Sequence, residues 1–237
     1  MQRDRWLCLS ALAFLCAVGC STTSPPASTA GLAPDGSGSA MPVTNYKSER
    51  WQQAIAGLTF DSGRVAIDRT VADGIAAPGA LAEAQAAYDA GMAEMEQGHR
   101  EWAVGHFRTA VLIAPFEPSM YEGLGYGLLS KGKSDQALAA YRTALDLQPA
   151  RLSALVGAAR SLDSASRAME ALTAWRDVLA VEPQHAAAHS RLASLYYFAA
   201  DYERALAHYE RAEALGHHVP VQLRPLIEAQ LQQANSN

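Results

Sequence analysis

The stretch "KGKSDQALAAYRTALDLQP", residues 131–149, decides the fold of this chain, because its pattern recurs along the sequence. It carries small residues at Ala137 and Ala144, an aromatic residue at Tyr141 and a proline at Pro149. Steps of 34 residues reach the matching sets Ala103, Phe107, Ala110 and Pro115; Ala171, Trp175, Val178 and Pro183; and Ala205, Tyr209 and Ala212. In the last set His217 stands where the proline is expected. A fixed period of this length indicates a repeat architecture.

Four blocks of equal length align without a gap: 84–117, 118–151, 152–185 and 186–219. Within each block we expect two antiparallel helices, with an apolar face on the first helix such as Tyr121, Leu124 and Leu128. The proline ends the second helix because it cannot donate a helical hydrogen bond. This pattern resembles the tetratricopeptide-repeat family. The resemblance implies an all-α fold, a right-handed solenoid of four helix-turn-helix repeats.

The two ends of a repeat stack need caps, because each end would otherwise expose a core face. Residues 220–237 predict a C-terminal capping helix and tail, with Leu223, Leu226, Ile227 and Leu231 at roughly helical spacing. The lead-in, residues 46–83, is harder to assign. Its stretch "TFDSGRVAIDRTVADG", residues 59–74, is broken by glycines and acidic residues. Loop, short strand and disorder all stay open for it.

Residues 1–19 have the layout of a secretory signal, with Arg3 and Arg5 before the apolar run from Trp6 to Val18. The end of this segment, residues 17–20, reads Ala-Val-Gly-Cys and resembles the lipobox of bacterial lipoproteins. The resemblance implies cleavage before Cys20 and acyl chains on its thiol. Ala17 departs from that pattern, in which leucine is usual. The alternative is an ordinary secretory signal that happens to contain a cysteine.

Residues 20–45 begin with this cysteine and continue as a Ser-, Thr-, Pro-, Gly- and Ala-rich stretch with one charge, Asp35. Such a composition buries too little apolar surface to offset its ordering entropy, so we expect a disordered tether. Its root-mean-square reach is about 25 to 30 Å. The other cysteines, Cys8 and Cys16, leave with the signal. The mature chain then has no free thiol and no disulfide.

Charge and motifs exclude several function classes. The chain has 19 Lys and Arg against 24 Asp and Glu, a net charge of -5, which disfavours nucleic-acid binding. No nucleophile elbow, Gly-rich phosphate loop or cysteine metal site is present in the sequence. His185 and His189 have the spacing of a metal pair, but solvated or helix-capping histidines are the simpler interpretation. We therefore expect no enzyme, no metal and no cofactor apart from the lipid on Cys20.

The tetratricopeptide resemblance implies a partner-binding concave groove lined by the first helix of each repeat. Its positions two, five, nine and twelve supply the expected groove residues: Tyr88, Met92, Met95, Tyr126, Leu129, Val156, Arg160 and Tyr197. Position twelve of the third block is Asp163, which follows Arg160 along the groove. We expect these residues to face this groove rather than the packed interior. One subfamily clamps carboxylates with Lys and Asn, where this chain has Tyr88 and Met92, so that mode is excluded. In the alternative, the segment around Trp51, Ile55 and Leu58 folds back and fills the groove.

The succession of signal, tether, lead-in and short repeat array resembles the TadD-type lipoproteins of the Flp/Tad pilus assembly machinery. Ser21 after the lipidated cysteine fits outer-membrane sorting in lipoproteins. The resemblance implies a lipid-anchored protein of the outer membrane that faces the periplasm and acts as a pilotin for a secretin subunit. The alternatives are a scaffold for peptidoglycan hydrolases and a type IV pilus biogenesis lipoprotein.

Overall fold

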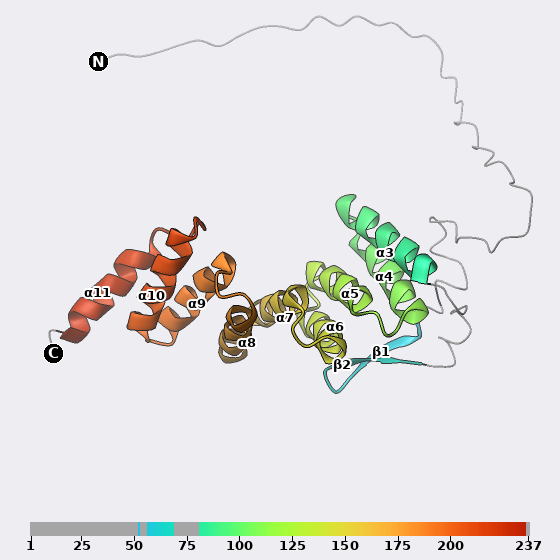
Figure 1. The fold of residues 1–237 in the computed structure, drawn as a ribbon, viewed down its shortest axis with the longest axis horizontal. Helices are drawn as coiled ribbons and strands as arrows, with labels where there is room; N and C mark the ends of the chain where they lie inside the picture. Colours follow the sequence, from blue (N-terminus) through green and yellow to red (C-terminus); the bar gives the residue numbers. More distant parts are fainter. Residues whose placement is uncertain (1–51, 53–55, 69–80, 236–237) are drawn as a thin grey trace, which may run out of the picture. The chain divides into compact units, whose positions relative to one another are not determined.

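The computed structural model describes residues 52, 56–68 and 81–235, all within the unit Ala40–Asn237 (Figure 1). The predicted signal and tether, Trp51, Ile55 and most of the lead-in lie outside the described residues. The elements are β1 (Leu58–Asp61), β2 (Arg64–Ile67), α3 (Leu81–Glu96), α4 (Arg100–Ile113), α5 (Pro118–Ser130), α6 (Ser134–Leu147), α7 (Leu152–Ser164), α8 (Ala168–Val181), α9 (Ala186–Phe198), α10 (Tyr202–Ala214) and α11 (Leu223–Asn235).

Helices α3 to α10 form four successive pairs, each joined by a short turn, and each pair packs on the next (Figure 1). We call α3, α5, α7 and α9 the first helices and α4, α6, α8 and α10 the second helices. Second helices also contact the first helix that follows, and α5 packs on both α3 and α7. The predicted all-α solenoid is therefore confirmed. Among the described helices, none is both long and apolar enough to cross a bilayer.

Tyr141 of the second helix α6 fills the space between the first helices α5 and α7. Tyr141 is 5% exposed, and a Cβ atom at Gly125 of α5 would lie 2.8 Å from its ring. A Cβ atom at Gly157 of α7 would lie 2.2 Å from the same ring. Contacts this short are incompatible with any larger residue unless the ring moves, so the two glycines let the helices close around Tyr141.

The turn inside every repeat contains one residue in the left-handed region. In the first two repeats these residues are Gly98 and Gly132, with φ of 82° and 72°. In the last two they are Ser166 and Ala200, with φ of 58° and 59°. The reason is the helix end: the N–H after each left-handed residue bonds a carbonyl five residues back, as in a Schellman motif. Glycine meets this need without strain, whereas serine and alanine do not.

Each second helix that is followed by the repeat proline has its C-cap at the residue before that proline, where the backbone leaves the helical conformation. Gln148 has φ of -144° and Glu182 has φ of -126°, extended values that a following proline favours. The fourth repeat lacks this proline, and α10 ends instead at Ala214, with Leu215 as its C-cap and Gly216, at φ of 73°, after it. The departure from the sequence pattern at His217 thus coincides with a different helix end.

The described part of the lead-in is a β-hairpin, the short-strand option left open by the sequence. β1 and β2 pair antiparallel around Ser62 and Gly63, which both have positive φ, the requirement of a tight two-residue turn. The hairpin packs on α6, where the Val65 N–H donates to Thr143 Oγ1 at 3.0 Å. Arg64 also pairs with Asp146 of α6. The hairpin, with buried Leu58, therefore lies on a second helix and not along the first helices.

The C-terminal helix α11 packs against α10 as a cap. Leu223 and Ile227 are buried, and Pro225 occupies the third position of the helix, where no helical N–H is needed. Leu226, which shares the helical spacing noted in the sequence, is 50% exposed.

Candidate partner-binding groove

The first helices carry all eight residues expected in the groove, but the residues differ in burial. Tyr126 is 43% exposed and Arg160 is also exposed. The others are partly buried and pack against the core: Tyr88, Met92, Met95, Leu129, Val156 and Tyr197. Partial burial is compatible with lining a groove, so the expectation that these side chains face a shared groove stays a prediction. A first helix in this stack presents one continuous surface, so long side chains at its border reach both the core and solvent.

Tyr141 belongs to a second helix, and several groove residues lie close enough to its phenol to affect its pKa. Burial raises its pKa, and the nearby Arg160 guanidinium opposes that rise. Glu122, Tyr126 and Tyr88 raise this pKa further. Residues from α3, α5 and α7 therefore gather around one phenol that lies between the glycines of α5 and α7. The sequence pattern predicted Tyr141 as a core residue and did not indicate that its phenol would lie next to groove residues.

The α3 and α5 end of the groove combines aromatic rings with an ion pair. The Tyr88 ring packs on Phe107 with 5.5 Å between the ring centroids. Burial raises the pKa of Tyr88, and Glu122 adds to this effect. Arg151 Nε donates to Glu122 Oε1 at 2.6 Å, and Ser153 donates to the same oxygen. Glu122 is therefore already engaged, and the surface available here is mainly aromatic and aliphatic.

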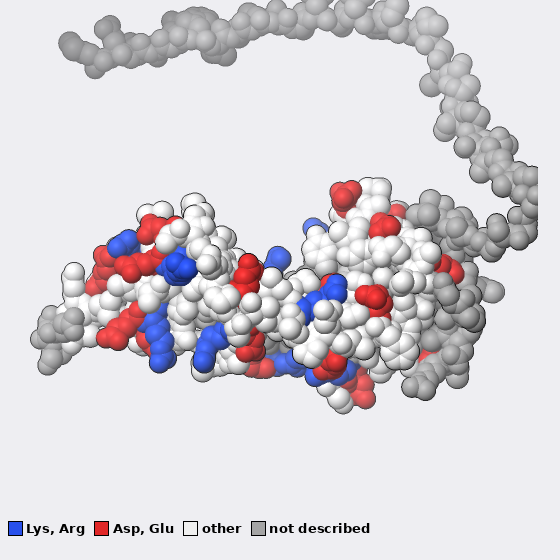
Figure 2. Space-filling model, viewed as in Figure 1, with Lys and Arg blue, Asp and Glu red and all other residues white. Residues whose placement is uncertain are grey.

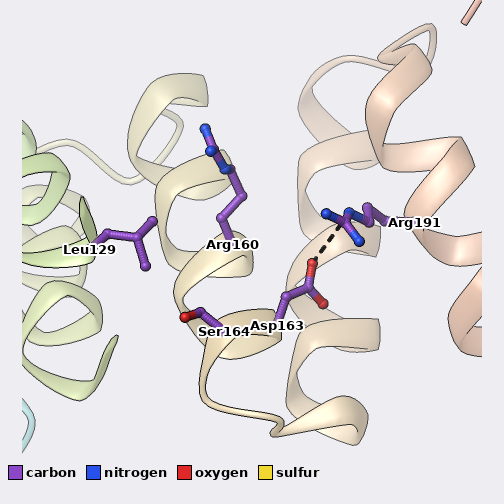
Figure 3. A pocket seen from close by; sticks show the side chains of 5 residues that line it. All are labelled: Leu129, Arg160, Asp163, Ser164 and Arg191. Carbon is purple, nitrogen blue, oxygen red and sulfur yellow. Dashed lines mark ion pairs between the residues drawn. The ribbon is translucent and has the colours of Figure 1, made fainter. Parts of the chain in front are cut away.

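A polar pocket of about 370 Å³ lies further along the first helices. Its lining residues are Leu129 of α5, Arg160, Asp163 and Ser164 of α7, and Arg191 of α9. Figure 3 shows Leu129 pointing toward α7 from one side and Arg191 pointing back toward α7 from the other. Side chains from three successive first helices therefore converge, and three of them, Leu129, Arg160 and Asp163, are at expected groove positions.

Asp163 connects this pocket to the core. The Trp175 Nε1–H donates to Asp163 Oδ2 at 2.9 Å, and Arg191 Nε lies 3.7 Å from that oxygen. Burial raises the pKa of Asp163, whereas the hydrogen bond from Trp175 and the charge of Arg191 oppose the rise. Asp163 is thus held by two partners, one from the interior and one from the next repeat.

Tyr197, the last of the expected groove residues, belongs to a different cluster. Its ring packs against Phe198 at 5.6 Å and Tyr202 at 5.8 Å between centroids. These residues surround the turn between α9 and α10. Tyr197 does not line the polar pocket.

The histidines have structural partners. His185 caps α9 by accepting the Ala188 N–H at its Nδ1, at 3.1 Å. His189 instead is buried, with its Nδ1 2.9 Å from His208 Nδ1 and its Nε2 3.0 Å from the Pro183 carbonyl oxygen. The interpretation of His189 as solvated or capping is wrong, because it bridges α9 to α10. Among the described residues, no group of three or more His, Cys, Asp and Glu is placed to hold a metal.

The surface view gives no indication of a nucleic-acid site. On the face in Figure 2, acidic and basic side chains are interspersed over the C-terminal helices. Much of the surface over α3 to α5 on this face is uncharged. Phosphate backbones require clustered basic side chains, and this face has no continuous basic stripe.

Ser164 and Arg191 are the pocket residues that sequence reasoning missed, although a signal was available for Arg191. Arg191 occupies the sixth position of its repeat, where the two preceding repeats have Gly123 and Gly157. Those glycines give room to Phe107 and Tyr141. At the following junction the aromatic residue is Trp175, and the sixth position holds an arginine, which lies near the Asp163 oxygen that Trp175 hydrogen-bonds. A break in the glycine pattern next to Arg160 and Asp163 thus marks the pocket.

Comparison with known proteins supports the fold. A structure of MamA is 16% identical over 62% of this chain and 84% of its own, with a TM-score of 0.54. A structure of MamA AMB-1 is 19% identical over 73% of this chain and 94% of its own, with a TM-score of 0.53. These identities support a shared fold alone. No curated protein matches the sequence of this chain significantly.

The family model described as tetratricopeptide repeat matches residues 88–151, 123–167 and 156–217. These matches overlap and together reach across more than half of the 237 residues. They cover the helices that build both the aromatic end of the groove and the polar pocket. The resemblance noted from the repeating Ala, aromatic and Pro positions is thereby confirmed. The chain belongs to the tetratricopeptide repeat family.

Proposed function

We propose that this protein is a non-enzymatic adaptor that holds a segment of a protein partner against its first helices. The observation that carries the proposal is Tyr126, a large aromatic side chain that is 43% exposed on a first helix. It shares the neighbourhood of Tyr141 with Tyr88 and Arg160. Exposed aromatic side chains with a polar tip are typical anchors for a partner segment.

We further propose that the partner is an outer-membrane secretin subunit and that the protein acts as a pilotin of a Tad (Flp) pilus. The support is the order of segments: a lipobox-like sequence at Cys20, a polar tether and a short repeat array. Acyl chains on Cys20 would hold the protein to the outer membrane from the periplasmic side. The tether would give the repeats a reach of about 25 to 30 Å from that anchor.

The test is co-purification of secretin with the adaptor from detergent extracts. Tyr126→Asp places a carboxylate where an apolar partner surface would desolvate it, so capture should fall at least tenfold. The matched control is Met169→Asp, because Met169 is 72% exposed to solvent but lies in the first turn of the second helix α8. A substitution at Met92 is less suitable for this test. Met92 packs partly against the core, so its replacement would affect both binding and folding.

Three outcomes would contradict the proposal. Undiminished capture by Tyr126→Asp places the partner surface elsewhere. Absence of secretin from the wild-type extract, with peptidoglycan hydrolases in its place, supports the cell-wall scaffold instead. Recovery of type IV pilus components would assign the protein to that machinery.

A further inference from the structure

We infer that the polar pocket formed by Leu129, Arg160, Asp163, Ser164 and Arg191 binds a carboxylate group of a peptide. The inference rests on the proposed function in that the peptide belongs to the protein partner. The carboxylate comes either from the C-terminus of the partner or from an Asp or Glu side chain, and the pocket chemistry is the same for both.

The charges of the pocket favour an anion. Two guanidinium groups, Arg160 and Arg191, and one carboxylate, Asp163, line the pocket. Asp163 is already engaged by the Trp175 indole at 2.9 Å. Its distance of 3.7 Å to Arg191 Nε exceeds that of a hydrogen bond, and the Arg191 side chain is 62% exposed. The donors of Arg191 are thus only loosely held by Asp163.

In the described part of the chain, no hydrogen bond or ion pair gives Arg160 a structural role. It forms no ion pair or hydrogen bond with the residues described there, and its electrostatic neighbour is the Tyr141 phenol. An ion pair that fastens α7 to α9 would account for Asp163 and Arg191 but leaves Arg160 unexplained. Arginine presents its N–H groups in a planar fork that matches a carboxylate.

The remaining lining residues fit a carboxylate better than a phosphate. The two arginines and Asp163 together give the pocket one excess positive charge. This charge suits a monoanion and disfavours a dianion. Leu129 provides an apolar wall for the carbon atoms that precede the carboxylate. A volume of about 370 Å³ admits the charged group together with one side chain.

This pocket differs in place and composition from the carboxylate clamp excluded by the sequence. That clamp would use Tyr88 and Met92 of the first repeat, whereas the pocket uses the second, third and fourth repeats. The α3 and α5 end of the groove supplies aromatic contacts, and the polar pocket supplies charged groups. A partner segment that reaches both would need an apolar stretch followed by a carboxylate.

The experiment uses the mature full-length protein and three synthetic peptides of one apolar sequence, acetyl-Ala-Leu-Leu-Ala-Phe-Leu. The first has a free C-terminal carboxylate, the second a C-terminal amide, and the third the amide with Asp in place of the fourth residue. Binding is measured by calorimetry or by NMR titration at low salt. At least one carboxylate peptide should bind tenfold or more tightly than the plain amide, and the stronger of the two identifies the source of the carboxylate.

Arg160→Gln and Arg191→Gln should each weaken carboxylate peptide binding about tenfold and leave binding of the amide unchanged. Added salt should reduce the same difference. The matched control is Arg176→Gln, an exposed arginine of the second helix α8, which should bind all three peptides as the wild type does. Thermal melts of each variant separate a loss of contact from a loss of folding.

Equal binding of all three peptides, including no detectable binding of any, would overturn the inference, as would wild-type binding by Arg160→Gln. These results do not depend on secretin. If secretin is captured but the carboxylate peptides fail, the pocket inference alone is wrong. If the carboxylate peptides bind but secretin is not captured, the assignment of the partner fails and the pocket stands.

Discussion

Trp175 and Asp163 are joined by a hydrogen bond of 2.9 Å from the indole Nε1 to a carboxylate oxygen. Trp175 is 1% exposed, so one end of this contact is in the core and the other end borders the polar pocket. The contact ties α8 to α7 within one repeat. Its strength can be separated from that of the ring itself by two substitutions.

Trp175→Ala should lower the free energy of unfolding by about 3 to 5 kcal/mol, the range for truncating a buried large aromatic side chain. Trp175→Phe keeps much of the ring but removes the N–H donor, and should cost about 1 to 3 kcal/mol. Urea unfolding monitored by circular dichroism measures both. Trp102→Ala serves as the control, because Trp102 is more exposed to solvent and should change stability less. An unaltered midpoint for Trp175→Ala would show that the repeat register is incorrect.

Ala200→Gly should stabilise the protein by about 0.5 kcal/mol. Ala200 has φ of 59°, a conformation that costs an alanine about 1 to 2 kcal/mol, and the flexibility of glycine in the unfolded chain offsets part of the gain. The reciprocal control is Gly132→Ala at the equivalent turn, where an added Cβ would meet no atom within 4 Å. That change should destabilise by about 1 kcal/mol through conformation alone. Opposite signs for the two variants are expected, and equal signs would be inconsistent with the left-handed turns.

Acidification should weaken the contact between α9 and α10 through His208. Burial lowers its pKa to about 4, and the nearby His189 contributes to the shift. The Pro183 carbonyl can only accept, so His189 Nε2 donates to it and, in the neutral pair, His208 Nδ1 donates to His189 Nδ1. The unfolded chain takes up a proton near the ordinary pKa of about 6.5, before the folded chain does. Stability is therefore complete above about pH 6.5 and declines toward pH 4.

Urea unfolding at pH 7.5 and pH 4.5 measures this decline, to which His208 should contribute on the order of 1 to 2 kcal/mol. His208→Gln should reduce the difference between the two pH values. His218→Gln is the control, since His218 is exposed in the turn after α10. NMR titration of the imidazole gives the pKa directly, and a value near 6.5 for His208 would refute the prediction.

Cys20→Ala should release the protein from the outer membrane into the soluble periplasmic fraction, if acyl chains on Cys20 are its anchor. Its net charge of -5 gives little attraction to anionic lipid, so no strong electrostatic contact would replace the lipid. Cell fractionation with immunoblotting measures the distribution. Ser21→Ala leaves the cysteine in place and is the control. A Cys20→Ala variant that stays with the outer membrane even in cells without secretin would disprove lipid anchoring through this residue.

The fold could be predicted from the 34-residue repeat, because the helices of each pair are specified by the spacing of residues that are close in sequence. Ala137, Tyr141 and Pro149 each have a role that sequence spacing alone reveals. The β-hairpin was left open because its strands are four residues each and gain stability from contact with α6, which no local pattern encodes. Its turn residues Ser62 and Gly63 were the available local signal.

The candidate site was predictable only in part. Leu129, Arg160 and Asp163 followed from the groove positions of the repeat, and all three line the polar pocket. Arg191 lies at a position that normally belongs to helix packing, so its role depends on the neighbouring Trp175 and Asp163 in three dimensions. The burial of Met92 likewise depends on how closely the helices approach, which the sequence does not specify.

The replacement of a packing glycine by Arg191 also affects how the array unfolds. The stability of a repeat stack is approximately the sum of its units and of the couplings between neighbours. The contact of α8 with α9 is sparser than that of α6 with α7. Cooperativity should therefore be lowest at this seam, so that α9 to α11 open and close as a separate foldon at less than the global free energy. A peptide carboxylate held between Arg160 and Arg191 would bridge the seam, and hydrogen exchange in α9 to α11 would slow when the partner is bound.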